Sequence, residues 1–306
     1  MNHPHDKLFK QTFSQPAVVA SLIQDLFPPE LAAEIDLNSL QLTNNSYIDE
    51  ALNEHFADLV YQCTLRNLTV FRIALLLEHK SYPDKHPHLQ LLRYMLNHWQ
   101  QDVQHGTGLT PIIPVVIYHG NSRWTYRSLA SQLAGFHESL RQYIPDFEYI
   151  LVDLSHLDDE RILAFRNKFL ALSSMLLKYH DNRRYIRVLK QHIQSLLATV
   201  TVEELAALIL PTFLYLSETS NLTSNEIVAI FKMVSQKTEQ VAMNAAEQLR
   251  MEGRLEGRQQ GHQEATVAHI KGLLELGLTT ADIAKAFKLP EKTVLEIVQQ
   301  LKNRES

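Results

Sequence analysis

The chain is organised around the stretch Val70-Phe71-Arg72-Ile73-Ala74-Leu75-Leu76-Leu77-Glu78-His79-Lys80-Ser81. Its apolar run has the length of a β-strand and ends in a carboxylate and an amine two positions apart. Because successive side chains on a strand alternate between its faces, Glu78 and Lys80 project to one side and His79 to the other. No other lysine in the sequence has an acidic residue two positions before it. Taken alone, the pattern also fits an ordinary salt pair where a strand emerges into solvent.

A second strand is predicted over residues 55–65, with Asp58 near its beginning and a turn at Arg66-Asn67. The two strands then form an antiparallel hairpin. If the turn is centred near Leu68, Asp58 lies directly opposite Glu78, whereas a tight two-residue turn displaces it by about three positions. In the first register Asp58, Glu78 and Lys80 form one patch.

Such a patch has a specific chemistry. Adjacent carboxylates repel each other and are costly to desolvate unless a cation compensates them. Mg²⁺ takes hard oxygen ligands from one or two carboxylates and retains several waters. A neighbouring lysine can orient or deprotonate a water, or stabilise the charge that develops on a phosphate. The patch therefore predicts a metal site that acts on phosphate.

The sequence around the hairpin indicates a mixed α/β core. A short helix and turn are predicted over residues 31–40, before the hairpin, and a helix over 88–104, after it. That second helix has an apolar stripe that includes Leu89, Leu92, Leu96 and Trp99. Residues 112–120 are apolar on both faces of a strand, which is typical of a central strand, and residues 149–154 form one more short strand.

Composition narrows the class of protein. The chain has 306 residues, a formal net charge of −5 and a single cysteine, Cys63. One cysteine fits a reducing cytoplasm and excludes a disulfide framework or a cysteine-based zinc site. We expect no membrane span and no signal peptide, because no apolar run reaches 18 residues and no basic, apolar leader is present. The pairs His3-x-His5 and His86-x-His88 are interpreted as solvated loop residues.

The C-terminal third is predicted to be helical. Gly253, Gly257 and Gly261 recur every four residues, which fits either a helix that contacts a partner or a flexible linker. Two short helices joined around Lys288-Leu289-Pro290 resemble a helix-turn-helix. Glu291, Lys292 and Thr293 would open its recognition helix if it binds DNA. Since nothing there is strongly basic, packing or protein contact is the competing interpretation.

Several motifs together resemble one family, the Rpn (recombination-promoting nuclease)/putative transposase or YhgA-like family of the PD-(D/E)XK nuclease superfamily. The resemblance covers residues 5–120 and, more loosely, the helical remainder. The motifs are His5-Asp6-x-x-Phe9-Lys10, Phe27-Pro28-Pro29-Glu30-Leu31, Ser46-Tyr47-Ile48-Asp49-Glu50, Ala57-Asp58-Leu59-Val60-Tyr61, Leu77-Glu78-His79-Lys80-Ser81 and Leu92-Arg93-Tyr94-Met95.

The resemblance implies a restriction-endonuclease-like mixed β-sheet core flanked by helices, with an α-helical C-terminal extension. It implies catalysis by Asp58, Glu78 and Lys80, with Asp58 and Glu78 binding Mg²⁺, for which Mn²⁺ can substitute, and Lys80 positioning the attacking water. Gln90 matches a supporting glutamine of the superfamily, and Asp6 is a further acidic group whose part in the site is left open. The proline of the superfamily's name is absent, because Ala57 precedes Asp58.

The expected function is a cytoplasmic, metal-dependent DNA endonuclease linked to recombination or mobile elements. DNA is the expected partner, and a homodimer would account for cleavage of both strands. The competing functions are a non-catalytic DNA-binding or assembly protein with an idle site, and a strand-transferring transposase. We expect a nuclease-like core over residues 1–155, a helical extension over 156–238, a glycine-interrupted helix or linker over 239–264 and a helical tail over 265–306.

Overall fold

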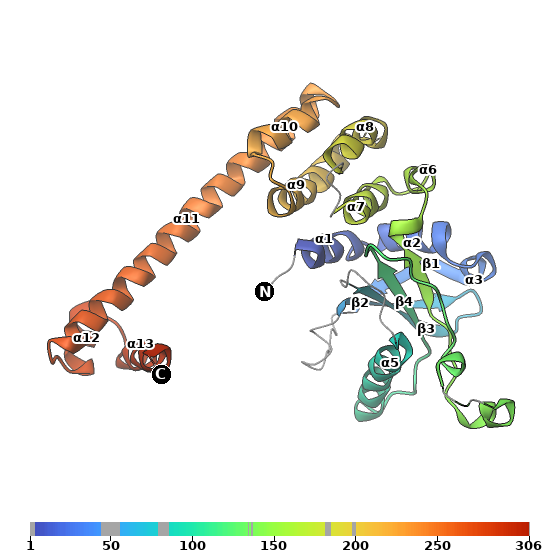
Figure 1. Cartoon of the computed structure of the whole chain (residues 1–306), viewed down its shortest axis with the longest axis horizontal. Helices are drawn as coiled ribbons and strands as arrows, with labels where there is room; N and C mark the ends of the chain where they lie inside the picture. The colour runs from blue at the N-terminus through green and yellow to red at the C-terminus, as the bar shows by residue number, and fades with distance from the viewer. Residues whose placement is uncertain are drawn as a thin grey trace. The chain divides into compact units, whose positions relative to one another are not determined.

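The computed structural model places a five-stranded mixed sheet at the centre of the N-terminal part of the chain (Figure 1). It describes residues 4–43, 56–78, 86–133, 135, 137–180, 185–197 and 200–305. The strands follow the order β1-β2-β3-β4-β5, with the first two neighbouring pairs antiparallel and the last two parallel. Their bounds are Ile35–Leu42, Phe56–Leu65, Val70–Glu78, Ile112–Tyr118 and Ile150–Asp153. The predicted fold class, a restriction-endonuclease-like mixed sheet flanked by helices, is confirmed.

The described chain divides into two compact units, Met1–Met243 and Asn244–Ser306. The first unit holds the sheet and most of the helices. These are α1 (Pro4–Phe13), α2 (Pro16–Leu26), α3 (Pro29–Glu34), α5 (Pro87–Gln104), α6 (Asp159–Leu163), α7 (Lys168–Lys178), α8 (Tyr185–Leu197), α9 (Val202–Thr219) and α10 (Ser224–Lys232). None of the described helices is long and apolar enough to cross a membrane.

The prediction of a short helix and turn for residues 31–40 is confirmed only as far as Glu34 and is wrong beyond it. Helix α3 ends at Glu34, and strand β1 begins at Ile35, where a short helix and turn were expected. Ile35 pairs with Leu65 of β2, and the register shifts between Asp36 and Gln41. Cross-strand hydrogen bonds to a partner distant in sequence therefore override the local pattern.

The β2–β3 hairpin has a register between the two that the sequence allowed. Thr64 pairs with Val70 and Asp58 with Leu76, so the turn is centred on Asn67 rather than near Leu68. Asp58 is therefore two positions away from Glu78 and not directly opposite it. The Leu68 N–H donates to the Leu65 carbonyl at 2.9 Å, and Leu68 has a φ of 68°, so the loop has three residues and ends in a left-handed conformation.

Leu68 provides a test of this loop. A β-carbon in the left-handed region costs about 1–2 kcal/mol, and asparagine tolerates that region better than most residues. Leu68 is 81% exposed, so its side chain contributes little burial. Leu68→Asn should raise the free energy of unfolding by about 0.5–1 kcal/mol. Leu68→Ala, which keeps the β-carbon but has no polar group to bond locally as asparagine does, should give no gain in the same denaturant titration.

The two faces of the sheet are covered by different helices (Figure 1). Helix α5 covers one face, where Leu91 and Tyr94 pack against Val60, Ala74 and Leu76. The other face meets α1, and the Tyr61 hydroxyl donates to the Phe13 carbonyl at 2.8 Å. The central strands β3 and β4 are consequently buried on both sides, as predicted for residues 112–120.

Helix α5 presents a different side to the sheet from the one predicted. Its buried residues include Leu91, Tyr94, Met95 and His98, whereas Leu89 and Leu96 are exposed. The stripe was misplaced because the core side of this helix carries polar and aromatic side chains. His88 is likewise buried in its first turn and is not the solvated loop residue expected from the sequence.

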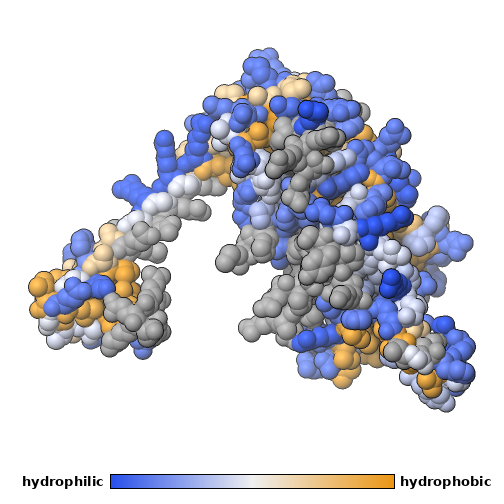
Figure 2. Space-filling view, in the orientation of Figure 1, coloured by the Kyte–Doolittle hydropathy of each residue, from blue (hydrophilic) through white to orange (hydrophobic). Residues whose placement is uncertain are grey.

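The second unit contains α11 (Gln236–Glu275) from Asn244 onward, α12 (Thr280–Phe287) and α13 (Glu291–Glu305). Its small core is formed by Ile270, Ile283, Ala284 and Val294. Between α12 and α13 Lys288 adopts a left-handed φ of 54°, which closes α12 and turns the chain. Apolar residues also reach the surface of this unit (Figure 2), among them Leu276, which is 77% exposed. The glycine repeat lies within the continuous helix α11.

Candidate functional site

Asp58 and Glu78 lie on the same face of the sheet. Asp58 pairs with Leu76, and Glu78 is two residues beyond Leu76 on β3, so all three positions share a face. Diagonal neighbours of this kind on an antiparallel pair are about 7–8 Å apart. Two carboxylate side chains at that separation can converge on one cation. Glu78 also pairs with Tyr118 across the parallel β3–β4 ladder, so it lies where two parallel strands end.

The structure describes the other predicted site residues to different extents. Lys80 lies outside the described residues, as do the side chains of Asp58 and Glu78. Gln90 lies in α5, the helix that covers the Asp58 face, and its Oε1 atom is buried. Asp6 lies in α1, which packs on the opposite face. Among the described side chains, no group of three or more histidines, cysteines or acids is arranged to hold a metal.

A histidine cluster that the sequence did not reveal lies at the same edge of the sheet as Glu78. His119 directly follows Tyr118, and its ring centroid is 5.0 Å from that of His5 and 4.7 Å from that of His180. The His180 Nδ1 lies 2.8 Å from the Leu177 carbonyl, which can only accept, and 3.3 Å from the His119 Nδ1. His180 therefore carries the proton on Nδ1, and the His119 Nδ1 accepts. Because these three histidines are far apart in the sequence, no regular spacing could have revealed the cluster.

The far end of α5 is fixed to the sheet by a charged pair. Arg72 of β3 donates two hydrogen bonds to the Asp102 carboxylate, at 3.0 and 2.7 Å, in a bidentate arrangement. Burial by itself would raise the pKa of Asp102, but the bonds from Arg72 and from the Thr110 N–H hold that pKa below its ordinary value. Burial, with a smaller contribution from the Arg72 charge, lowers the pKa of the neighbouring His98. His98 is therefore neutral beside an ion pair.

The buried histidine makes stability depend on pH. The unfolded chain protonates His98 near pH 6.5, whereas the folded chain does so only at lower pH. The unfolded state thus binds more protons below about pH 6.5, and stability falls as the pH is lowered, by at most about 1.4 kcal/mol per unit for one histidine. Denaturant titrations at pH 7, 6 and 5 should show this fall. His98→Gln should reduce the slope, whatever its effect at pH 7, and a slope unchanged in that variant contradicts the assignment. His137→Gln serves as the exposed control.

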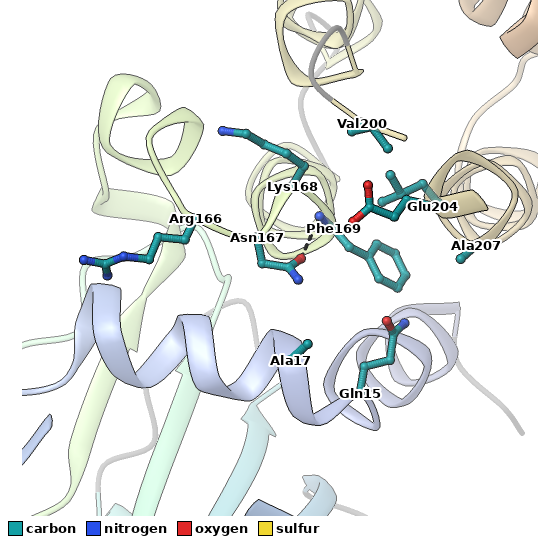
Figure 3. A pocket seen from close by; sticks show the side chains of 10 residues that line it. Gln15, Ala17, Arg166, Asn167, Lys168, Phe169, Val200, Glu204 and Ala207 are labelled. Carbon is teal, nitrogen blue, oxygen red and sulfur yellow. Dashed lines mark hydrogen bonds between the residues drawn. The ribbon is translucent and has the colours of Figure 1, made fainter. Parts of the chain in front are cut away.

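A cavity of about 320 Å³ lies beside the start of α7 (Figure 3). Its charged side chains are already engaged. Arg166 pairs with Asp25 at 2.6 Å, and Lys168 donates to the Leu163 carbonyl. Glu204 caps α9 with Thr201. Asn167 accepts from the Phe169 N–H and so caps α7. We therefore interpret these side chains as structural, because each already forms an ion pair, caps a helix or bonds to the backbone.

The mixed sheet and the acidic strand ends define the chain as a protein of the restriction-endonuclease-like fold class. The family model described as "Putative transposase, YhgA-like" matches residues 3–207. The chain belongs to that family, as its motifs implied.

Several curated relatives extend the comparison. "Recombination-promoting nuclease RpnA" of Escherichia coli K12 is 26% identical over 293 residues, which is 94% of this chain and 95% of that protein. "Recombination-promoting nuclease RpnC" of the same strain is 25% identical over 61% of this chain and 62% of its own length. "Inactive recombination-promoting nuclease-like protein RpnE", also of that strain, is 24% identical over 90% of each chain. No solved structure matches.

Proposed function

We propose that this chain is a metal-dependent DNA endonuclease of the PD-(D/E)XK type that acts in recombination or on mobile elements. The proposal rests on the register of the β2–β3 hairpin. In that register Asp58, near the start of β2, and Glu78, at the end of β3, share one face of the sheet. A relative that aligns over nearly the whole chain is named a recombination-promoting nuclease. The E-x-K pattern that begins at Glu78 supplies the third functional group of this nuclease type.

The residues of the proposed site have different roles. Asp58 and Glu78 hold Mg²⁺ or Mn²⁺, since two carboxylates on one face are the hard oxygen ligands that these ions prefer. Lys80 positions the attacking water and stabilises the charge that develops on the phosphate. Gln90, projecting from the helix that covers this face, supports the site. The bound ion would lower the pKa of water and neutralise charge on the phosphate oxygens.

The relative named inactive suggests a second candidate function. A chain that retains this fold with an idle site would bind DNA or assemble with other copies without cutting. Asp58, Glu78 and Lys80 are all present in this sequence, which favours the active function. A strand-transferring transposase is the third function, and joined products would separate it from a hydrolase.

Metal binding tests the proposed site without any need for catalysis. In calorimetry with Mn²⁺ the chain should bind the ion, and Asp58→Asn or Glu78→Gln should weaken binding at least about 10-fold, because loss of a supporting group alone typically costs that much. Asp36 pairs with Thr64 on the same face of the sheet and is a matched control. Asp36→Asn should bind Mn²⁺ as the unmodified chain does. Equal weakening by Asp36→Asn would remove the support for this site.

A further inference from the structure

A second cavity, of about 290 Å³, opens on the α5 face of the sheet. It lies between the residue that follows β1, the strands β2 and β3, and the C-terminal end of α5. Its polar lining consists mainly of Thr43, Gln62, Arg72, His98, Gln101 and His105. Its volume suits one small ligand or one group of a larger molecule.

This cavity and the proposed catalytic site share a face of the sheet. Asp58, Val60 and Gln62 alternate along β2, and Gln62 lines the cavity. Four residues of strand separate Asp58 from Gln62, which corresponds to about 13 Å. That distance equals about four stacked nucleotides of one strand. Val60, between Asp58 and Gln62 on this face, is buried under α5. Gln41 of β1 pairs with Gln62, and both are exposed, so the rim of the cavity on the β1 side is polar and accessible.

The cavity offers hydrogen bonds without net charge. The Arg72 guanidinium is neutralised by Asp102, which it contacts through two hydrogen bonds. The buried His98 beside them is neutral, and Gln62 and Gln101 contribute amide groups that both donate and accept. A phosphate would find no uncompensated cation among these groups. A nucleobase presents a planar edge of donors and acceptors, which glutamine reads well.

The walls of the cavity are held in place before any ligand arrives. The Thr107 hydroxyl donates to the Asp102 carbonyl at 3.0 Å, and the Trp99 indole donates to the Thr110 carbonyl at 2.8 Å. The loop that follows α5 is therefore tied back onto the helix. A cavity with fixed polar groups loses little freedom when it binds.

We propose that the cavity lined by Gln62 and Gln101 is a base-binding subsite, which takes one unpaired nucleobase of the substrate strand a few nucleotides from the cleaved phosphate. This inference rests on the proposed nuclease function and names a feature of its substrate. It requires that the substrate contain a single-stranded or flipped nucleotide at that position.

Abasic scanning tests the subsite. Fluorescein-labelled single-stranded 12-mers, each lacking one base at a different position, are titrated with the full chain in EDTA, and binding is followed by anisotropy. One abasic position should weaken binding about 5–10-fold, the lower end of what a good bidentate side-chain contact to a base contributes. In Gln101→Ala the same abasic position should change affinity less than about 2-fold, because the partner of the base is already absent.

Gln104 gives a matched control, since it is exposed on the same helix and does not line the cavity. Gln104→Ala should retain the full abasic effect, and both variants should melt at the temperature of the unmodified chain. An abasic effect that is equal in Gln101→Ala, or the absence of any sensitive position, overturns the subsite. If the unmodified chain gives either of those results and still cleaves DNA normally, the nuclease function stands without the subsite. If the unmodified chain neither binds nor cleaves DNA, the nuclease function and the subsite are both overturned.

Discussion

Asp58→Asn should lower the rate of DNA cleavage by about 10³-fold or more. The substitution removes one of the two carboxylate charges placed on the same face of the sheet, and groups that stabilise charge in the transition state commonly contribute that much. Asparagine has nearly the shape of aspartate, so the β2–β3 ladder should persist. The measurement is single-turnover cleavage of a labelled duplex in Mg²⁺, with DNA binding measured in parallel.

The control for this loss is again Asp36→Asn, which removes an acid on the same face at the neighbouring strand. Its cleavage rate should lie within about 2-fold of the unmodified chain, because a single half-buried charge on a neighbouring strand has a small, screened effect at this distance. Lys80→Ala should resemble Asp58→Asn, with binding retained and cleavage lost. Cleavage that persists in Asp58→Asn would show that the reaction takes place elsewhere.

Asp102→Ala should reduce the free energy of unfolding by about 3–5 kcal/mol, the largest effect on stability that we predict. The Asp102 side chain is 5% exposed, and its removal leaves the Arg72 guanidinium, itself only 18% exposed, without its bidentate partner. The carboxylate also accepts from the Thr110 N–H at 3.1 Å, so the loop after α5 loosens as well. Urea titration followed by circular dichroism measures the change.

Two further variants separate ion pairing from packing. Arg72→Met combined with Asp102→Leu removes both charges, and this chain should be more stable than Asp102→Ala alone. Glu138→Ala breaks the exposed pair with Arg141 and should cost less than about 1 kcal/mol. If Asp102→Ala proved as mild as Glu138→Ala, the pair would not be what fixes α5 to the sheet.

The sequence was most informative where one kind of side chain dominates an element. The apolar runs that became β3 and β4 were recognisable because both faces of a central strand are buried. The positions of Asp58 and Glu78 near the ends of their strands followed from the same runs. Their exact offset did not, because it depends on a three-residue loop whose last member, Leu68, adopts a conformation unusual for leucine.

Other parts of the fold depend on partners that are distant in sequence. Strand β1 exists because Ile35 meets Leu65, and no local pattern reveals that pairing. The core side of α5 was misjudged because His98 and Asp102 are buried there against Arg72, and polar residues are ordinarily assigned to the surface. The cluster of His5, His119 and His180 is likewise a product of the tertiary structure.

We propose that Asp58 and its neighbours form a working, metal-dependent nuclease site. Incubation of supercoiled plasmid with the full chain in Mg²⁺, Mn²⁺ or EDTA, beside Asp58→Ala prepared in parallel, tests it most directly. We expect nicked or linear plasmid with either metal, none in EDTA and none with Asp58→Ala. Plasmid that remains supercoiled with both metals, although the chain binds it, would refute the nuclease function and favour the idle-site protein.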